Sequence, residues 1–182
     1  MVPPHTRSRL LHGIADKIEQ NADELATIES EDNGKQYEDS MGDIMFSAQV
    51  MRYYGSLCMS IQGKSMMRDN FGYYNNSYAY TRKEPVGICG LITPWNYPHL
   101  MTTYKIAPVL ATGCTGVVKI PELTPLSSLK LIQLIHEVDG MVPGVINMVS
   151  GLGSEAGEAL VDHPDVNKIS FTGSTAVGKR IK

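Results

Sequence analysis

Asn96 is the residue whose type and position point most directly to chemistry. It follows the apolar run Val86–Ile92, which is long enough for one buried strand, and it lies between Pro94 and Pro98. The two prolines fix the backbone and remove N–H donors, so neither a strand nor a helix continues through this loop. A polar amide is thereby held at the carboxyl end of a strand, where open α/β sheets bind their ligands. The alternative is that Asn96 caps the helix that follows.

Lys119 and Glu122 form a second candidate pair. Gly116–Lys119 has strand character, which puts the lysine at the carboxyl end of a strand and the glutamate in the following loop. An ammonium group donates hydrogen bonds and a carboxylate accepts them, so the two suit the hydroxyl groups of a ribose. The residues alone leave a solvent-facing Lys–Glu pair equally open. Thr124 and Pro125 then predict the start of a helix, with the threonine as its cap.

The segment from Phe171 to Arg180 is a glycine turn followed by a helical pattern. Such a turn offers backbone N–H groups and the positive end of a helix dipole to phosphate. Gly173–Lys179 matches the first seven positions of a Walker A loop, but the eighth, which must be Ser or Thr to bind magnesium, is Arg180. The loop also follows the fourth expected strand instead of the first. Taken alone, the segment is an ordinary turn with Ser174 as helix N-cap.

A second glycine turn, Gly151–Gly157, is a near match to the dinucleotide-binding fingerprint. Its third glycine comes one position late, and such a match is weak by itself. The simplest interpretation is a tight turn between a strand and a helix.

The three cysteines predict neither a metal site nor a catalytic thiol. Cys58, Cys89 and Cys114 form no close pair and no metal-ligand spacing, and none has a base or a cation nearby in sequence that would lower its pKa. Cys58 and Cys89 are expected to be small buried hydrophobes. Scattered thiols in odd number suit a reducing compartment, by default the cytoplasm, with the mitochondrion as an alternative. The histidines without a partner in the pattern are expected at the surface or at helix ends: His99, His136 and His163.

Apolar spacing predicts the elements that position these residues. Over Arg9–Glu31 apolar residues recur at helical intervals, and Asn21 with Glu24 resembles a capping box that starts a second helix. A third helix is expected at about Ser40–Leu57. Beyond it the pattern changes to turn residues at Asn75–Ser77 and an exposed strand at Tyr78–Thr81.

From Val86 onward, strand and helix patterns alternate. Strands are expected at Val86–Ile92, Gly116–Lys119, Val145–Val149 and Lys168–Phe171. Helices are expected at His99–Leu110, Thr124–Val138, Ser154–Val161 and from Ser174 to the end. Parallel strands joined by such helices give right-handed crossovers. The predicted fold is α/β, with a helical segment (1–60), an exposed hairpin segment (61–85) and a doubly wound, parallel Rossmann-like sheet (86–182).

Composition indicates an ordinary globular protein. The 182 residues are 42% hydrophobic and 19% charged, with a net charge of −3, enough for one domain or slightly more with a proper core. We find no basic cluster with interleaved aromatic residues, so no nucleic-acid partner is expected. No apolar run is long enough to span a bilayer, and the first residues do not have the pattern of a signal or transit peptide.

Together these motifs resemble those of the NAD(P)-dependent aldehyde dehydrogenases, over essentially the whole chain. The shared motifs are Pro94-Trp95-Asn96, Lys119 with Glu122, Pro143–Asn147 and Gly173-Ser174-Thr175. Tyr80–Gly87 is most similar to the NAD-linked cytosolic and mitochondrial class that includes the retinal dehydrogenases. The resemblance implies oxidation of an aldehyde to a carboxylate: a cysteine thiolate adds to the carbonyl, hydride leaves to NAD, and a glutamate-activated water releases the acid.

The resemblance also implies roles for single residues. Asn96 becomes an oxyanion-hole donor, Ser174 hydrogen-bonds the pyrophosphate of NAD, and Trp95 packs the loop beside the cofactor. The expected cofactor-binding residues are Ile92, Thr93, Pro94, Trp95, Lys119, Glu122, Gly153, Gly157, Phe171, Gly173, Ser174 and Val177. NAD is expected in preference to NADP, because the Glu122 carboxylate would repel a 2′-phosphate, although Lys119 acts in the opposite sense. No metal is expected.

The sequence departs from the family pattern at two places. Lys119-Ile120-Pro121-Glu122 stands where the family has Lys-Pro-(Ala/Ser)-Glu, so the backbone of this loop is expected to differ. Cys114 stands where the family has Asn, and strain is expected there because Asn tolerates a positive φ better than Cys does.

In this family the nucleophilic cysteine, the glutamate base and the oligomerisation strand lie downstream of the position of Lys182. The chain is therefore expected to be an incomplete N-terminal domain that does not turn over aldehydes by itself. The parent is expected to act on a small-molecule aldehyde as a homo-oligomer (dimer or tetramer), without nucleic-acid or membrane partners. A P-loop-type nucleotide-binding protein and a non-catalytic NAD-binding module remain as alternatives.

Overall fold

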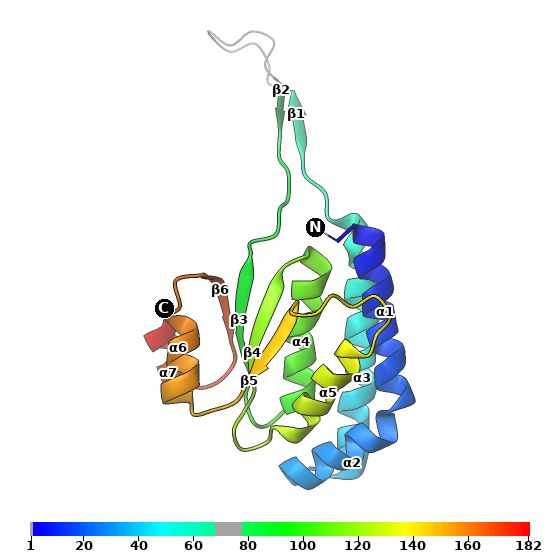
Figure 1. The fold of residues 1–182 in the computed structure, drawn as a ribbon, viewed down its shortest axis with the longest axis vertical. Helices are drawn as coiled ribbons and strands as arrows, with labels where there is room; N and C mark the ends of the chain where they lie inside the picture. The colour runs from blue at the N-terminus through cyan, green and yellow to red at the C-terminus, as the bar shows by residue number, and fades with distance from the viewer. Residues whose placement is uncertain (1, 68–77) are drawn as a thin grey trace.

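The computed structural model describes residues 2–67 and 78–182, so the turn expected at Asn75–Ser77 lies outside the described residues. The elements in chain order are α1 (Pro4–Gln20), α2 (Ala22–Asn33), α3 (Tyr37–Leu57), the 3₁₀ turn η1 (Cys58–Ser60), β1 (Ser65–Met67), β2 (Tyr78–Tyr80), β3 (Ile88–Ile92), α4 (Pro98–Thr112), β4 (Thr115–Lys119), α5 (Leu126–His136), β5 (Ile146–Val149), the π-helical turn η2 (Gly153–Gly157), α6 (Glu158–Val161), β6 (Val166–Phe171) and α7 (Thr175–Ile181) (Figure 1). The predicted α/β class is confirmed.

The main sheet has four parallel strands in the order β5-β4-β3-β6. From β3 the chain passes through α4 to β4 and through α5 to β5, so these strands are added on one side of β3. The next strand, β6, pairs with the other side of β3. The sheet is therefore doubly wound, as predicted. The strand order changes direction between β3 and β6, and doubly wound sheets bind ligands at such a point.

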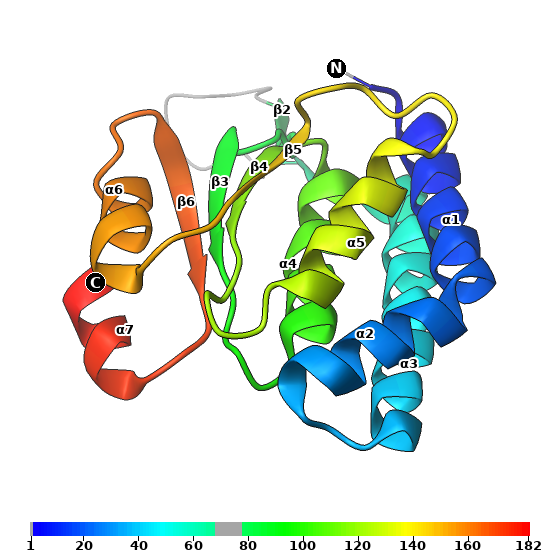
Figure 2. The same ribbon diagram turned by 60° about the horizontal axis from the view of Figure 1, so that its bottom comes forward.

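Helices cover both faces of this sheet (Figure 2). The helices α4 and α5 lie on one face, with α1, α2 and α3 beyond them, whereas α6 and α7 lie on the other face. Close contacts agree with this arrangement: a Cβ added at Gly116 of β4 would lie 3.5 Å from Val109 of α4, and one at Gly90 of β3 would lie 3.1 Å from Leu160 of α6. Within the described ranges, no helix is long and apolar enough to cross a membrane.

Most of the core lies between the sheet and the helices α1, α3, α4 and α5. The helical spacing predicted its inner face correctly, since Ile14, Ile18, Leu25 and Ile44 are fully buried. Burying one such side chain contributes roughly 1.5–3 kcal/mol. This contiguous cluster fixes the sheet face that carries α4 and leaves the opposite face to the short helices α6 and α7.

The strands β1 and β2 pair antiparallel in a separate two-stranded sheet, which projects away from the other elements in Figure 1. Tyr78 and Tyr80 of β2 are 64% and 73% exposed. The exposed strand expected at Tyr78–Thr81 is therefore confirmed.

The predicted start of α2 is confirmed, but the predicted capping box is not. The helix α1 begins at Pro4, ahead of the apolar spacing that starts at Arg9, because proline is well tolerated in a first turn, where its missing N–H is not needed. Asn21 is the N-cap residue of α2, as predicted, but its side chain makes no cap hydrogen bond. Its Nδ2 donates instead to the carbonyl oxygen of Lys17 at 2.7 Å and so closes α1.

The predicted cap of α5 was also wrong. The backbone N–H of Leu126 donates to Asp32 Oδ2 at 2.8 Å, so a carboxylate from the end of α2 caps this helix. Thr124, the predicted cap, donates its hydroxyl to the carbonyl oxygen of Trp95 at 2.8 Å. A carboxylate at the positive end of a helix dipole is favourable, and only the tertiary fold brings Asp32 there.

Two glycines explain further differences along β3 and β4. The strand β3 begins at Ile88 instead of Val86, because Gly87 has a φ of 116°, outside the range of a strand. The left-handed residue after α4 is Gly113, with a φ of 77°. Strain was expected at Cys114 because a positive φ was expected there. Gly113 adopts the positive φ instead, which glycine does without strain, so the expected strain does not arise.

Candidate functional site

The register of the sheet brings the predicted residues to one edge. Lys119 of β4 lies opposite Ile92 of β3, and Ile92 lies opposite Phe171 of β6, so three strands end in one row. The loops that follow carry Asn96, Glu122 and Ser174. Residues separated by up to 78 positions in sequence thus share the carboxyl edge of the sheet.

The loop after β3 is anchored through its backbone. The N–H and the hydroxyl of Thr93 both donate to the carbonyl oxygen of Lys119 at 3.3 Å. The carbonyl oxygen of Trp95 accepts from Asn33 Nδ2 at 2.7 Å and from the Thr124 hydroxyl. The indole of Trp95 itself is 59% exposed, so this residue anchors the loop through its main chain.

Asn96 is exposed beside this anchored backbone. The helix α4 has Tyr97 as its N-cap and Pro98 in its first turn, and within the described residues no side chain caps it. The alternative interpretation, in which Asn96 caps α4, is therefore wrong. Lys35 lies 4.4 Å from the centre of the Tyr97 ring, a cation–π contact that holds the end of this loop.

Lys119 and Glu122 form an ion pair, with Nζ 2.5 Å from Oε2. The lysine side chain is only 5% exposed, whereas that of the glutamate is 41% exposed. The hydrogen bond from Lys119 lowers the pKa of the Glu122 carboxyl, which therefore stays charged and able to accept hydrogen bonds. Ile120 is fully buried in the core and fixes the loop where it departs from the family pattern.

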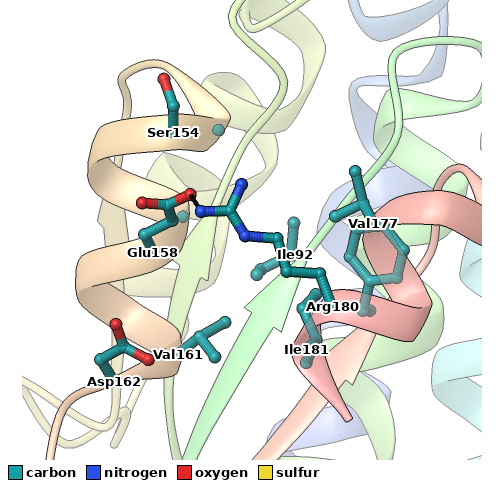
Figure 3. Close-up of a pocket in the computed structure, with 11 residues that line it drawn as sticks. Ile92, Ser154, Glu158, Val161, Asp162, Val177, Arg180 and Ile181 are labelled. Atoms are coloured by element: carbon teal, nitrogen blue, oxygen red, sulfur yellow. Dashed lines mark ion pairs between the residues drawn. The ribbon is translucent and has the colours of Figure 1, made fainter.

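A cavity of about 340 Å³ lies beside this row, within the size range of ligand sites. It sits at β3 and β6, where the strand order changes direction, and is walled by α6 and α7. Its lining residues are Ile92, Gly153, Ser154, Gly157, Glu158, Val161, Asp162, Phe171, Val177, Arg180 and Ile181 (Figure 3). Most of the walls are apolar, and the charged side chains are Glu158 of α6, Asp162 directly after α6, and Arg180 of α7.

Five of the residues expected at a cofactor site line this cavity: Ile92, Gly153, Gly157, Phe171 and Val177. The others do not line it: Thr93, Pro94, Trp95, Lys119, Glu122, Gly173 and Ser174. Sequence reasoning missed Ser154, Glu158, Val161, Asp162, Arg180 and Ile181. A usable signal existed, because the missed residues recur at intervals of three and four and so share one face of each helix.

Two glycines leave room at the cavity wall, and a third makes close packing possible. A Cβ added at Gly153 or Gly157 would meet no atom within 4 Å, so the space beside them is open. A Cβ at Gly173 would lie 2.5 Å from Cζ of Phe171. The Phe171 ring therefore packs onto the turn before α7, and only glycine permits this close approach.

Ser174 is the N-cap of α7, as predicted, and its Oγ accepts from the Val177 N–H at 3.3 Å. The Walker A interpretation does not fit this geometry. The helix already begins at Thr175, so Lys179 lies within α7, whereas a P-loop needs an open loop up to its lysine. The expected helix at Ser154–Val161 is divided into η2 and α6.

Two titratable residues are buried in α4, and no role was predicted for either. His99, expected at the surface or at a helix end, lies in the first turn of α4 but is fully buried, and its Nδ1 lies 3.1 Å from the Ser47 hydroxyl. Burial, together with the nearby charge of Lys35, lowers the His99 pKa to about 3. Lys105 donates to the Ser170 hydroxyl at 3.1 Å, and burial lowers its pKa to about 8.

The cysteines lie away from the carboxyl edge of the sheet. Cys58, Cys89 and Cys114 are all buried, and burial raises the pKa of the Cys89 thiol to about 11. For Cys114, burial acts to raise the pKa, but hydrogen bonds from the Thr112 hydroxyl and from backbone N–H groups outweigh it and lower the pKa. No base or cation contributes to this shift, so the expectation that Cys114 has no such neighbour is not contradicted. Cys114 nevertheless lies just before the first residue of β4, whereas Lys119 is the last residue of that strand. The thiol is therefore at the amino end of the strand, away from the candidate site.

Residues 2–67 and 78–182 contain no group of three or more His, Cys, Asp or Glu that could hold a metal.

Known proteins resemble this chain over its whole length. Residues 1–182 match the profile described as "Aldehyde dehydrogenase family". An aldehyde dehydrogenase of Enchytraeus buchholzi is 48% identical over 176 residues, which are 96% of this chain and 34% of that protein. The NAD⁺ complex of aldehyde dehydrogenase from Bacillus cereus superposes with a TM-score of 0.92 at 42% identity, covering 99% of this chain and 36% of that one. PnpE from Pseudomonas sp. WBC-3 gives a TM-score of 0.92 at 42% identity, with coverage of 98% and 36%. The chain thus spans about a third of the length of its relatives.

Proposed function

The chain belongs to the aldehyde dehydrogenase family, as its motifs predicted, and on this premise we propose that it supplies the NAD site and one oxyanion donor of an NAD-dependent aldehyde dehydrogenase. The whole enzyme would oxidise an aldehyde to a carboxylic acid. The observation that carries this proposal is the cavity at β3 and β6, beside the row formed by Lys119, Ile92 and Phe171. The similarity to an enzyme solved with bound NAD⁺ supports the choice of cofactor.

The residues present fit a dinucleotide. The cavity has apolar walls and open space beside Gly153 and Gly157, which suits a flat base. The paired Lys119 and Glu122 offer an ammonium donor and a carboxylate acceptor at the adjoining strand end, which suits ribose hydroxyls. The exposed hydroxyl of Ser174, next to the N-terminus of α7, suits a phosphate oxygen.

Each of these residues has a separate role in the proposed site. NAD, when bound, accepts a hydride from the substrate. Lys119 and Glu122 orient the ribose, and Ser174 hydrogen-bonds the pyrophosphate. Thr93, Pro94 and Trp95 fix the backbone that presents Asn96, through the bonds to Lys119, Asn33 and Thr124.

Asn96 is the proposed catalytic residue. Its amide donates to the oxygen of the aldehyde as negative charge develops there, which stabilises the transition state more than the ground state. The anchored backbone of Trp95, directly before Asn96, supports this role, because a donor on a fixed backbone needs less reorganisation during the reaction.

The larger organisation is also a proposal. We assign 1–182 to one NAD-binding domain, composed of the helical segment (1–60), the hairpin segment (61–85) and the βα units (86–182). The projecting β1–β2 sheet, with its exposed tyrosines and with edges that pair with no other strand of residues 2–67 and 78–182, supports a homo-oligomer. The scattered, unpaired thiols support a reducing compartment, by default the cytoplasm. A small-molecule aldehyde is the proposed substrate of the whole enzyme.

A fluorescence titration tests the cofactor proposal. Trp95 is the single tryptophan of the chain and lies in the loop beside Asn96, so its emission reports on this edge of the sheet. Saturable quenching by NAD is expected, with weaker affinity for NADP. Quenching by ATP that requires magnesium, without any response to NAD, would contradict the proposal and favour the P-loop alternative.

A further inference from the structure

An ion pair crosses the cavity between its two helical walls. Nη2 of Arg180 lies 2.6 Å from Oε1 of Glu158, and both residues line the cavity. Figure 3 shows the arginine side chain reaching from α7 across to the glutamate on α6. Within the described part of the chain, no other ion pair joins these two helices.

The contribution of this pair to folding is small. The side chains of Arg180 and Glu158 are 74% and 42% exposed, and exposed ion pairs contribute about 0–1 kcal/mol. The pair does, however, fix a planar cation at the rim of a cavity whose other walls are mainly apolar. Those apolar walls are Ile92, Val161, Phe171, Val177 and Ile181.

A guanidinium held in this way keeps much of its binding capacity. The glutamate occupies one Nη of Arg180, which leaves the flat face of the group and its remaining N–H donors. A planar guanidinium stacks on aromatic rings, an arrangement that a lysine ammonium cannot reproduce. A flat aromatic ligand in the cavity would meet apolar side chains and this cationic plane.

We infer that Arg180 binds the purine base of an adenine nucleotide by stacking, and that Glu158 is a positioning residue that holds the guanidinium at the cavity. The inference rests on the proposed function, because NAD is the adenine nucleotide expected at this site. The competing role for an arginine is a contact with phosphate. Adenosine, which has the base but no phosphate, separates the two roles.

The test is a set of titrations of the chain with adenosine and AMP, followed by ligand-observed NMR, and with NAD, followed by calorimetry. Arg180→Leu is expected to weaken all three ligands by the same factor, about 3- to 10-fold, which corresponds to one partly desolvated cation–π contact. Arg180→Lys keeps the charge but not the plane and is expected to lose most of that affinity. Glu158→Gln is expected to have a smaller effect, and none in the Arg180→Leu background, because it acts through the arginine.

Arg82→Leu is the matched control. Arg82 Nε lies 3.3 Å from Glu84 Oε1 in a similarly exposed ion pair that does not line the cavity, so unchanged affinities are expected. Melting temperatures of all variants are expected to agree within about 3 °C, since exposed pairs add little stability.

Three results would overturn the inference while the wild-type chain still binds NAD. The first is that Arg180→Leu binds adenosine, AMP and NAD as tightly as the wild type. The second is that Arg180→Leu loses affinity for AMP but not for adenosine. The third is that Arg180→Lys keeps the full wild-type affinity for all three ligands. Failure of the wild-type chain to bind either NAD or adenosine would contradict the proposed function, and the inference with it.

Discussion

At the scale of single residues, Asn96 carries the proposed chemistry. Its loop is held by backbone bonds to two other segments, and the structure excludes a role as the cap of α4. In a full-length enzyme that contains this chain, Asn96→Ala is expected to lower kcat by about 10²–10³-fold, the usual effect of removing one oxyanion donor. Steady-state kinetics measures this directly.

Two controls accompany the Asn96→Ala measurement. The affinity for NAD and the melting temperature are expected to stay unchanged, because the exposed amide makes no packing contact in the core. A variant that loses stability but keeps its kcat per folded molecule would show that Asn96 supports the fold and not the reaction.

Glu122 is expected to set the preference between NAD and NADP. Its lowered pKa keeps the carboxylate charged, and a second negative charge on a 2′-phosphate would be repelled. Glu122→Gln is expected to narrow the ratio of NAD to NADP affinities by about 3- to 10-fold, because the remaining Lys119 cation attracts the phosphate. Calorimetric titrations check this, with the exposed Glu38→Gln as control. A ratio that does not change would remove Glu122 from cofactor selection.

His99 makes the stability of the fold depend on pH. Its pKa of about 3 lies below the ordinary value of 6.5, so the unfolded chain binds a proton between these values that the folded chain does not. The stability is complete above about pH 6.5 and is lost as the pH falls toward 3. His99→Leu is expected to remove this loss and so to gain about 1–3 kcal/mol relative to the wild type between pH 6.5 and 4.

Denaturant unfolding at several pH values measures the His99 effect. The loss of the contact with Ser47 shifts the variant by a constant amount, so only the change with pH is diagnostic. Parallel stability profiles of the two proteins would mean that His99 is not held neutral in the fold.

At the scale of elements, the turn before α7 depends on close packing of one ring. A Cβ at position 173 would lie 2.5 Å from the Phe171 ring, so Gly173→Ala is expected to lower the free energy of unfolding by about 1–2 kcal/mol. Gly153→Ala, which meets open space, is expected to cost much less. In a Phe171→Leu background the penalty of Gly173→Ala is expected to shrink, because the clashing ring is absent. Equal penalties in both backgrounds would show that backbone conformation, and not the ring, requires this glycine.

The elements show which features the sequence predicts and which it does not. The four parallel strands were predicted within about two residues, because buried parallel strands are short apolar runs bounded by turn residues, whereas the exposed strand β1 was not predicted. The cap of α5 was missed because Asp32 reaches Leu126 only through tertiary packing. The burial of His99 at the start of α4 was missed for the same reason, since it depends on the position of α3 against α4.

The candidate site was predictable to a similar degree. The residues at strand ends, such as Lys119 and Ser174, follow from local motifs. The charged residues of the cavity, Glu158 and Arg180, do not, because the pairing of α6 with α7 is a property of the folded sheet. Their intervals of three and four positions were visible, but nothing in the chain identified the partner of either helix.

At the scale of the whole molecule, the strand order explains why the site lies where it does. Because β6 is added beside β3, the chain passes to the other face of the sheet at this junction, and the cavity opens there between the strand ends and the helices α6 and α7. Residues from β3, β6, α6 and α7 meet there, and the loops after β3 and β4 adjoin it. The central claim is therefore that NAD binds in this cavity.

Calorimetric titration of NAD into matched glycine variants tests this claim most directly. Gly157→Leu places a side chain beside the cavity, whereas Gly42→Leu makes the same change in a helix elsewhere, and an added Cβ meets no atom within 4 Å at either position. Gly157→Leu is expected to weaken NAD binding at least about 10-fold, equivalent to roughly 1.4 kcal/mol, with Gly42→Leu indistinguishable from wild type. Equal NAD affinity in all three proteins, each folded by circular dichroism, would contradict it.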